Sequence, residues 1–149
     1  MIETVYSKWK IIKWPTAMSA FSSPRLESLS DGMQLQIIVN NPAYGDHQPR
    51  MEFIFSGIYA YRNINRSYRN SLFKAIPTAG MGNTWMVQNS DFLDLLKEDA
   101  QGALTFKDAR HFVILTENDV IEVVSAAPPR MRLLKADDVS DEESQVVPG

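Results

Sequence analysis

The sequence predicts an α+β domain in which one or two short helices accompany a mostly antiparallel β-sheet of about five to seven strands. Two segments carry this prediction. Residues 112–116 and 120–124 are β-branched runs separated by a short polar turn, which is the pattern of a β-hairpin. Residues 90–102 carry the start signal, apolar stripe and stop signal of one helix. The length of 149 residues is typical of a single domain.

The hairpin is the strongest of these signals. Its turn, Glu117-Asn118-Asp119, contains an Asn-Asp pair that tolerates the positive φ of a tight hairpin. Both runs are apolar on both faces, so we expect a central position in the sheet with cover on each side. Pro128-Pro129 ends the second run, and residues 131–134 are then expected to add an edge strand.

Other strands are expected earlier in the chain. A short strand at 26–30 and an alternating one at 33–39 flank the turn signal Asp31-Gly32. Residues 51–62 read as one long strand with Gly57 at a bulge or bend, and residues 85–87 as a short apolar strand. The pattern at 5–14 fits a strand or a helix, and 63–76 fits a strand or irregular structure.

The helix is expected to begin at Asn89-Ser90, because a short polar side chain can accept hydrogen bonds from the first free backbone N–H groups. An apolar stripe follows, and Asp91 and Asp94 suit the positive N-terminal end. Gly102 then supplies the left-handed conformation that commonly ends a helix. The apolar stripe consists of Phe92, Leu93, Leu95 and Leu96.

Composition excludes several classes of protein. The absence of cysteine excludes a disulfide framework, a thiolate metal site and a cysteine nucleophile. No secretory signal or membrane-spanning run is evident, so a cytoplasmic location is expected. Five acids lie after Lys135, and removing them from the net charge of −3 leaves a body of +2. We therefore expect one domain at 1–135 and an acidic, disordered tail at 136–149 that is dispensable for folding.

No catalytic motif is recognisable. His47 and His111 lack the spacing of a metal site, and a structural or surface role is expected for each. The glycines at 80 and 82 lack the lysine of a phosphate-binding loop. The carboxylates at 91, 94, 98 and 99 are better explained as helix charges than as a catalytic pair. No cofactor or metal is predicted.

Glu122 is the one charged residue inside an apolar strand. A carboxylate there needs a donor, and Arg110 and Arg62 are the candidate partners. A structural ion pair is the favoured interpretation, and an acid with a raised pKa in a pocket is the alternative.

Aromatic and basic residues are interleaved between positions 59 and 74. We predict that Tyr59, Tyr61, Arg62, Arg66 and Arg69 contribute to a surface that binds a macromolecule. Tyr and Arg also suit single-stranded nucleic acid, but the sequence pI of about 5.3 favours a protein partner.

Two stretches, residues 53–62 and 110–124, together with Gln88–Leu93 resemble small bacterial proteins, among them immunity proteins that accompany toxins. The resemblance covers about half the chain and includes no catalytic signature. It implies a non-enzymatic domain that binds one protein partner. The alternatives are binding of nucleic acid or of a small ligand, a subunit of a homodimer, and an enzyme with an unrecognised carboxylate site.

Overall fold

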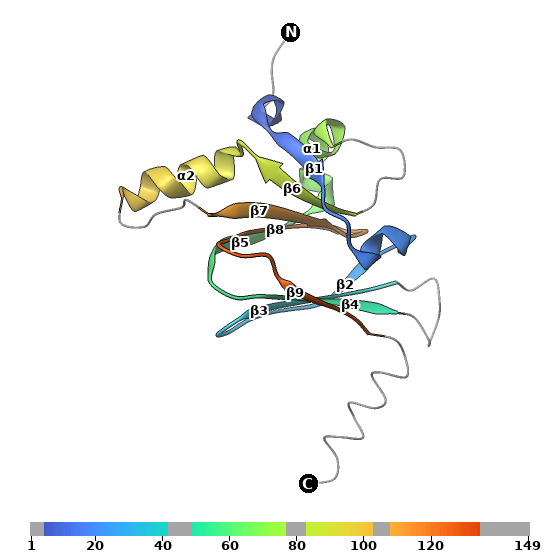
Figure 1. Ribbon diagram of the computed structural model, residues 1–149. Helices are drawn as coiled ribbons and strands as arrows, with labels where there is room; N and C mark the ends of the chain where they lie inside the picture. The colour runs from blue at the N-terminus through green and yellow to red at the C-terminus, as the bar shows by residue number, and fades with distance from the viewer. Residues whose placement is uncertain (1–4, 42–48, 77–82, 103–107, 135–149) are drawn as a thin grey trace.

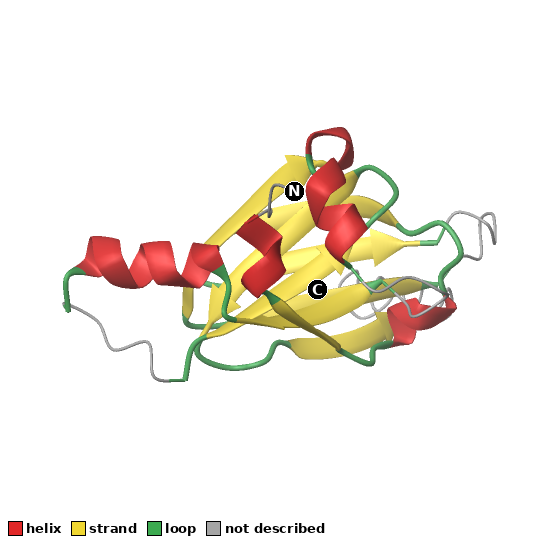
Figure 2. Ribbon diagram, turned by 90° about the horizontal axis from the view of Figure 1, so that it is seen from above, coloured by secondary structure: helices red, strands yellow, loops and turns green. Residues whose placement is uncertain are grey.

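The protein is built from two antiparallel sheets that face each other, with helices over the outer side of one of them (Figures 1 and 2). The computed structural model describes residues 5–41, 49–76, 83–102 and 108–134. These ranges contain nine strands and two α-helices, which confirms the predicted α+β class with mostly antiparallel sheet. The strands form two sheets rather than a single sheet of five to seven strands.

The larger sheet, sheet A, has the strand order β1-β6-β7-β8-β5. Its strands are β1 (Lys10–Lys13), β5 (Ile58–Asn65), β6 (Thr84–Gln88), β7 (Arg110–Leu115) and β8 (Asp119–Ser125). The predicted hairpin is confirmed, because β7 and β8 pair antiparallel from Arg110 opposite Ser125 to Leu115 opposite Val120. It lies inside the sheet as expected, with β6 on one side and β5 on the other.

The smaller sheet, sheet B, has the order β2-β3-β4-β9. It contains β2 (Arg25–Asp31), β3 (Leu35–Asn40), β4 (Arg50–Phe55) and β9 (Arg130–Leu134). The expected turn at Asp31-Gly32 joins β2 to β3, and β9 is the predicted edge strand. The strand expected at 51–62 is in fact two strands in different sheets. Gly57, with a φ of +64°, lies where the chain passes from β4 to β5.

The main hydrophobic core fills the space between the sheets. Strand alternation sends Phe112 and Ile114 of β7 and Val123 of β8 towards sheet B, and all three are buried. They meet side chains of sheet B such as Phe53 and Phe55, and Trp14 packs against both Phe53 and Phe112. This core explains why β7 and β8 are apolar on this face.

A second core lies on the opposite face of sheet A. The 3-10 turn η1 (Val5–Lys8), the helix α1 (Asn70–Ala75) and the helix α2 (Asp91–Ala100) lie on that side (Figure 2). The buried residues of this core include Trp9, Leu72, Val113 and Val120. Sheet A is therefore covered on both faces, as the sequence of β7 and β8 predicted.

Local signals set the limits of α2. The Ser90 hydroxyl accepts a hydrogen bond from the backbone N–H of Leu93 at 3.1 Å, which confirms the predicted N-cap. At the other end both Gln101 (φ +50°) and Gly102 (φ +81°) adopt left-handed conformations. The left-handed conformation that ends the helix therefore begins at Gln101, one residue before the predicted Gly102. The hairpin turn after β7 needs no positive φ at Asn118 or Asp119, contrary to expectation.

Some predicted features lie outside the described residues, namely the loop histidine at 47, the glycine loop at 80–82 and the acidic tail. Within the described ranges, no helix is long and apolar enough to cross a membrane.

Candidate functional site

A fully buried carboxylate lies at the centre of the layer between sheet A and the helices. Glu122 is in the middle of β8, and because side chains alternate between the two faces of a strand, it points away from sheet B. Its neighbours across the sheet are Arg62 of β5 and Val113 of β7. The side chain is 0% exposed, so every charge on it must be balanced from within the protein.

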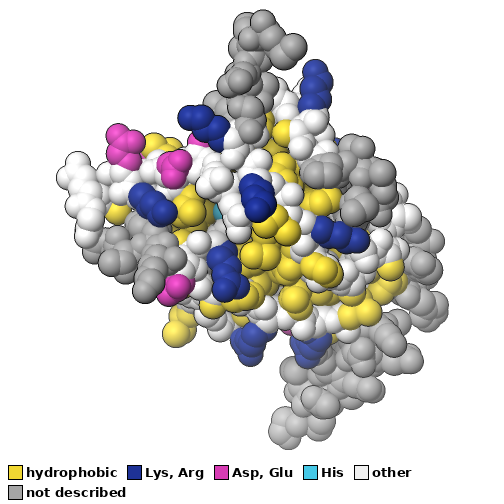
Figure 3. All heavy atoms as spheres, turned by 45° about the horizontal axis from the view of Figure 1, so that its top comes forward, with side chains coloured by type: hydrophobic (Ala, Val, Ile, Leu, Met, Phe, Trp, Pro, Cys, Tyr) yellow, Lys and Arg dark blue, Asp and Glu magenta, His cyan; other side chains and the backbone are white. Residues whose placement is uncertain are grey.

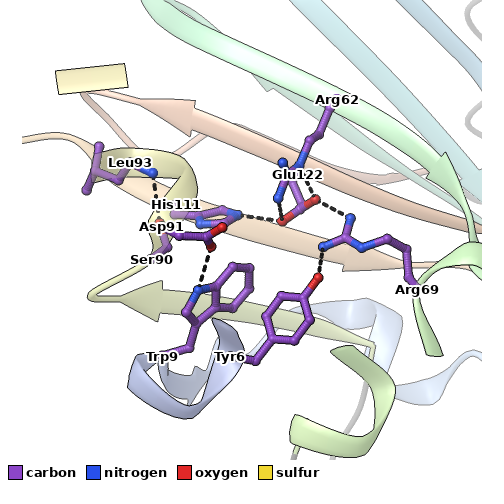
Figure 4. A network of polar contacts seen from close by, with 9 residues as sticks. All are labelled: Tyr6, Trp9, Arg62, Arg69, Ser90, Asp91, Leu93, His111 and Glu122. Carbon is purple, nitrogen blue, oxygen red and sulfur yellow. Dashed lines mark hydrogen bonds and ion pairs between the residues drawn. The ribbon is translucent and has the colours of Figure 1, made fainter. Parts of the chain in front are cut away.

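Two arginines and one histidine converge on Glu122 (Figure 4). Arg62 donates twice, from Nε to Oε2 at 2.6 Å and from Nη2 to Oε1 at 3.1 Å. Arg69 donates from Nη1 to Oε2 at 2.5 Å, and His111 Nε2 lies 3.0 Å from Oε1. The carboxylate thus takes part in four hydrogen bonds with three residues, which is close to its full capacity as an acceptor. We call these four residues the Glu122 cluster.

The Glu122 cluster keeps the carboxylate ionised. Burial on its own raises the pKa of Glu122, but hydrogen bonds from His111, Arg62 and Arg69 outweigh burial and hold the pKa well below its usual value. Burial likewise lowers the pKa of Arg69, and the interaction with Glu122 more than compensates. The predicted partner Arg62 is confirmed. The other candidate, Arg110, is exposed and forms no ion pair with Glu122 in the described part of the chain. The alternative of a raised-pKa acid is wrong.

His111 is held in one orientation by its surroundings. An ionised carboxylate only accepts hydrogen bonds, so the Nε2 atom that faces Glu122 must carry the proton. The other ring nitrogen, Nδ1, is buried and has no hydrogen-bond partner among the described residues. The rings of Trp9 and Phe92 pack edge-on against the imidazole, with centroids 5.1 and 5.6 Å away. His111 is 0% exposed, so of the two roles expected for it the surface role is excluded, and the structural role stays a prediction.

Aromatic residues from η1 and α2 close the cluster. The guanidinium of Arg62 lies over the ring of Phe92, 4.1 Å from its centroid, and the Arg69 Nη2 atom donates to the Tyr6 hydroxyl at 3.4 Å. Trp9, which lies between η1 and β1, donates from Nε1 to Asp91 at 2.8 Å and so ties this segment to the first turn of α2 (Figure 4). The cluster therefore joins β5, β7 and β8 to the helical layer.

This geometry is suited to holding structure rather than to proton transfer. A glutamate that orients a histidine is one half of a general-base arrangement, in which the free ring nitrogen meets the substrate. Here that nitrogen is buried, and the carboxylate is already bonded to two guanidinium groups and to His111 itself. No group of three or more metal-ligating side chains is found in the described ranges.

The cluster also fixes a short surface turn, the 3-10 turn η4 (Arg66–Tyr68) between β5 and α1. Asn65 starts it, because its Oδ1 accepts from the Ser67 N–H at 2.9 Å. The backbone N–H of Arg66 donates to the Asn118 carbonyl at 2.8 Å, and its guanidinium stacks 4.1 Å above the Phe73 ring. Arg69 follows at the far end, where Glu122 holds it.

One aromatic side chain on η4 is left in solvent. Tyr68 is 81% exposed, although it lies between two arginines that are each held by several contacts. Arg66 is exposed as well. We call the exposed side chains of Arg66 and Tyr68 the η4 surface. It presents an arginine and a tyrosine from a turn that is fixed at both ends.

The structure separates the five predicted binding residues. Arg62 and Arg69 meet at Glu122, where Arg69 is buried and the Arg62 side chain is 32% exposed. Arg66 is on the η4 surface. Tyr61 packs against the core between the sheets, and a hydrogen bond with Asp31 raises its pKa. Tyr59 is half-buried where the β5–β8 register shifts. Their role in binding stays a prediction.

Sequence reasoning missed Tyr6, Trp9, Phe92 and Tyr68. The first three reach the Glu122 cluster from segments at least 19 residues away in the sequence from every member of the cluster, so no local pattern reveals the contact. Tyr68 was noted among the basic residues, but only its exposure distinguishes it from the half-buried tyrosines of β5.

Comparison with protein-family models, with curated proteins and with solved structures found no match to this chain.

Proposed function

We propose that this protein is a non-enzymatic domain of the immunity-protein type, and that it binds another protein through the η4 surface. The observation that carries the proposal is the 81% exposure of Tyr68 on a turn clamped by its neighbours. Tyrosine and arginine are the side chains that most often supply binding energy at the centres of protein interfaces.

A rigid turn also reduces the cost of binding. Side chains that are ordered before association lose less conformational entropy when the complex forms. Arg66 is already held by the Phe73 ring and by its backbone bond to Asn118. The Glu122 cluster contributes by holding Arg69, the residue that directly follows the turn. In this proposal the buried ions therefore support the binding surface without touching the partner.

The arrangement favours a protein over nucleic acid. Of the three arginines between 62 and 69, two are committed to Glu122, which leaves Arg66 as the one exposed arginine of this described segment. Binding to nucleic acid depends on several phosphate contacts and falls steeply with salt. A single arginine beside one tyrosine fits an interface anchor better than a phosphate-tracking groove.

The experiment compares three immobilised proteins in an extract of the source cells. The test variant combines Arg66→Ala with Tyr68→Ala, neither of which contacts Glu122. The matched control combines Lys97→Ala with Leu95→Ala, which removes an exposed cation and a 53% exposed apolar side chain from α2. A partner retained by the parent and the control but lost by the test variant is expected.

The same partner bound equally by all three proteins would contradict the proposal. Nuclease treatment separates the alternative: loss of binding after the nucleic acid in the extract is digested would assign the η4 surface to nucleic acid.

A further inference from the structure

The described strands leave four sheet edges, at β1 and β5 of sheet A and at β2 and β9 of sheet B. Exposed edges invite pairing with other chains, and proteins usually guard them with charges, bulges or short strands. β1 is four residues long and begins and ends with lysine. β2 and β5 each contain a register shift. β9 has no register shift, because its five residues pair with β4 without interruption, and its charges are the two arginines Arg130 and Arg132.

The side chains of β9 alternate between two kinds. Arg130 and Arg132 share the outer face of sheet B with Glu52 and Ile54, their partners on β4. Met131 and Leu133 point to the other face and are 43% and 37% exposed, so the free edge of sheet B carries some apolar surface. Figure 3 shows hydrophobic side chains gathered in the middle of one face of the molecule, with Lys and Arg around them.

A depression of about 350 Å³ lies along β9, lined by Glu52, Ile54, Arg130, Met131 and Arg132. Its size is at the lower end of ligand pockets, which suits one or two side chains of a peptide. Glu52 is buried, where it accepts from Gln36 at 2.8 Å and pairs with Arg132 at 3.4 Å. Arg130 is exposed and forms no ion pair with a described residue, so the outer face of β9 carries uncompensated positive charge.

The arginines argue against pairing of β9 with a second copy of itself. When two β9 strands pair antiparallel over their full length, Arg132 lies opposite Arg132 of the second copy, and directly opposed like charges destabilise a sheet. A partner strand with acidic residues opposite Arg130 and Arg132 would instead form ion pairs with them. Its intervening residues would cover Met131 and Leu133 if they were apolar.

We propose that the free edge of β9 binds an extended segment of a protein partner in which acidic and apolar residues alternate. The backbone of that segment pairs with β9, its acids face Arg130 and Arg132, and its apolar side chains cover Met131 and Leu133. This site is separate from the η4 surface and does not depend on it, because β9 belongs to sheet B and η4 follows a strand of sheet A.

The test uses the full chain and synthetic peptides as probes, with binding followed by NMR at the backbone amides. The acidic probe is Glu-Val-Glu-Val-Glu with capped ends. Two comparison peptides replace each Glu by Lys, or carry N-methyl groups on every second amide so that one backbone edge cannot pair. Shifts centred on residues 130–134 are expected for the acidic probe, with at least about tenfold weaker binding of both comparison peptides.

Two variants test the role of charge. Arg130→Glu replaces an exposed cation of β9 by an anion. It is therefore expected to reverse the preference, so that the lysine probe binds more tightly than the acidic probe. Lys97→Glu makes the same charge change on the exposed face of α2 and should leave binding unaltered.

Each other outcome overturns the proposal. Equal binding of the N-methylated probe would mean charge attraction without strand pairing, and shifts away from β9, or none, would remove the site. Concentration-dependent dimers that Arg130→Glu disrupts would identify a second copy as the occupant. Binding that appears only after Asp137, Asp138 and Asp141 are changed to Asn would assign the edge to the chain's own acidic segment.

Discussion

Replacing Glu122 with Gln removes one negative charge and leaves the guanidinium groups of Arg62 and Arg69 facing each other without a counter-ion. Arg69 is 6% exposed, so water cannot replace the lost carboxylate, whereas Arg62 can turn partly to solvent. Breaking a buried ion pair in this way costs about 3–5 kcal/mol. We expect about 3 kcal/mol, the lower end of that range, because Arg62 is partly solvated and Gln keeps one acceptor oxygen.

Urea unfolding at pH 7 measures this loss. The free energy of unfolding of the parent and of Glu122→Gln is compared with that of Glu117→Gln, which removes the same group from the exposed Arg25–Glu117 pair in the turn of the same hairpin. A surface pair contributes about 0–1 kcal/mol. A loss of 3 kcal/mol corresponds to a midpoint lower by about 1–2 M urea. Similar losses in the two variants would refute the structural role of the Glu122 cluster.

Adding Arg69→Met to Glu122→Gln provides a further check, because it removes a buried cation that has lost its partner. The double variant is expected to be more stable than the sum of the two single losses predicts. Strictly additive losses would show that the two charges do not interact in the folded protein.

Three further predictions follow from the fold. Folding lowers the pKa of Glu122, so its ionised carboxylate stabilises the folded protein above the unfolded pKa of about 4.3, and this stabilisation is lost as the pH falls below that value. In urea unfolding between pH 6 and 3, the free energy of unfolding should therefore fall less steeply for Glu122→Gln than for the parent. Val123→Asp should cost several kcal/mol or abolish folding, since Val123 is fully buried between the sheets; a folded, soluble variant with an unchanged melting temperature would be inconsistent with that position. Ser90→Ala should cost about 1 kcal/mol by removing the N-cap of α2, and an unaltered midpoint in urea would mean that the Ser90–Leu93 bond contributes nothing.

The local part of this fold was predictable from sequence. The β7–β8 hairpin and the start of α2 depend on residues close together in the chain, and their signals agree with the structure. The division into two sheets was not predictable, because residues 51–62 have the alternation of one strand. Only packing shows that Gly57 marks a passage between sheets rather than a bulge within one.

The site was predictable in part for the same reason. An isolated carboxylate in an apolar strand requires a partner, and this reasoning pointed to Arg62. The contributions of Arg69 and His111 depend on how α1 and β7 are placed around β8, which no pattern in the sequence specifies. Burial also decides which of several similar residues faces solvent, and it distinguishes Tyr68 from Tyr61.

The central claim is that the η4 surface binds a protein partner. The most direct measurement is the dissociation constant of the captured partner for the parent and for the Arg66→Ala, Tyr68→Ala variant, each at low and at high salt. Two interface anchors worth about 2 kcal/mol each predict a weakening of several hundredfold or more, with only a modest effect of salt on the parent. Equal dissociation constants for the two proteins would contradict the claim.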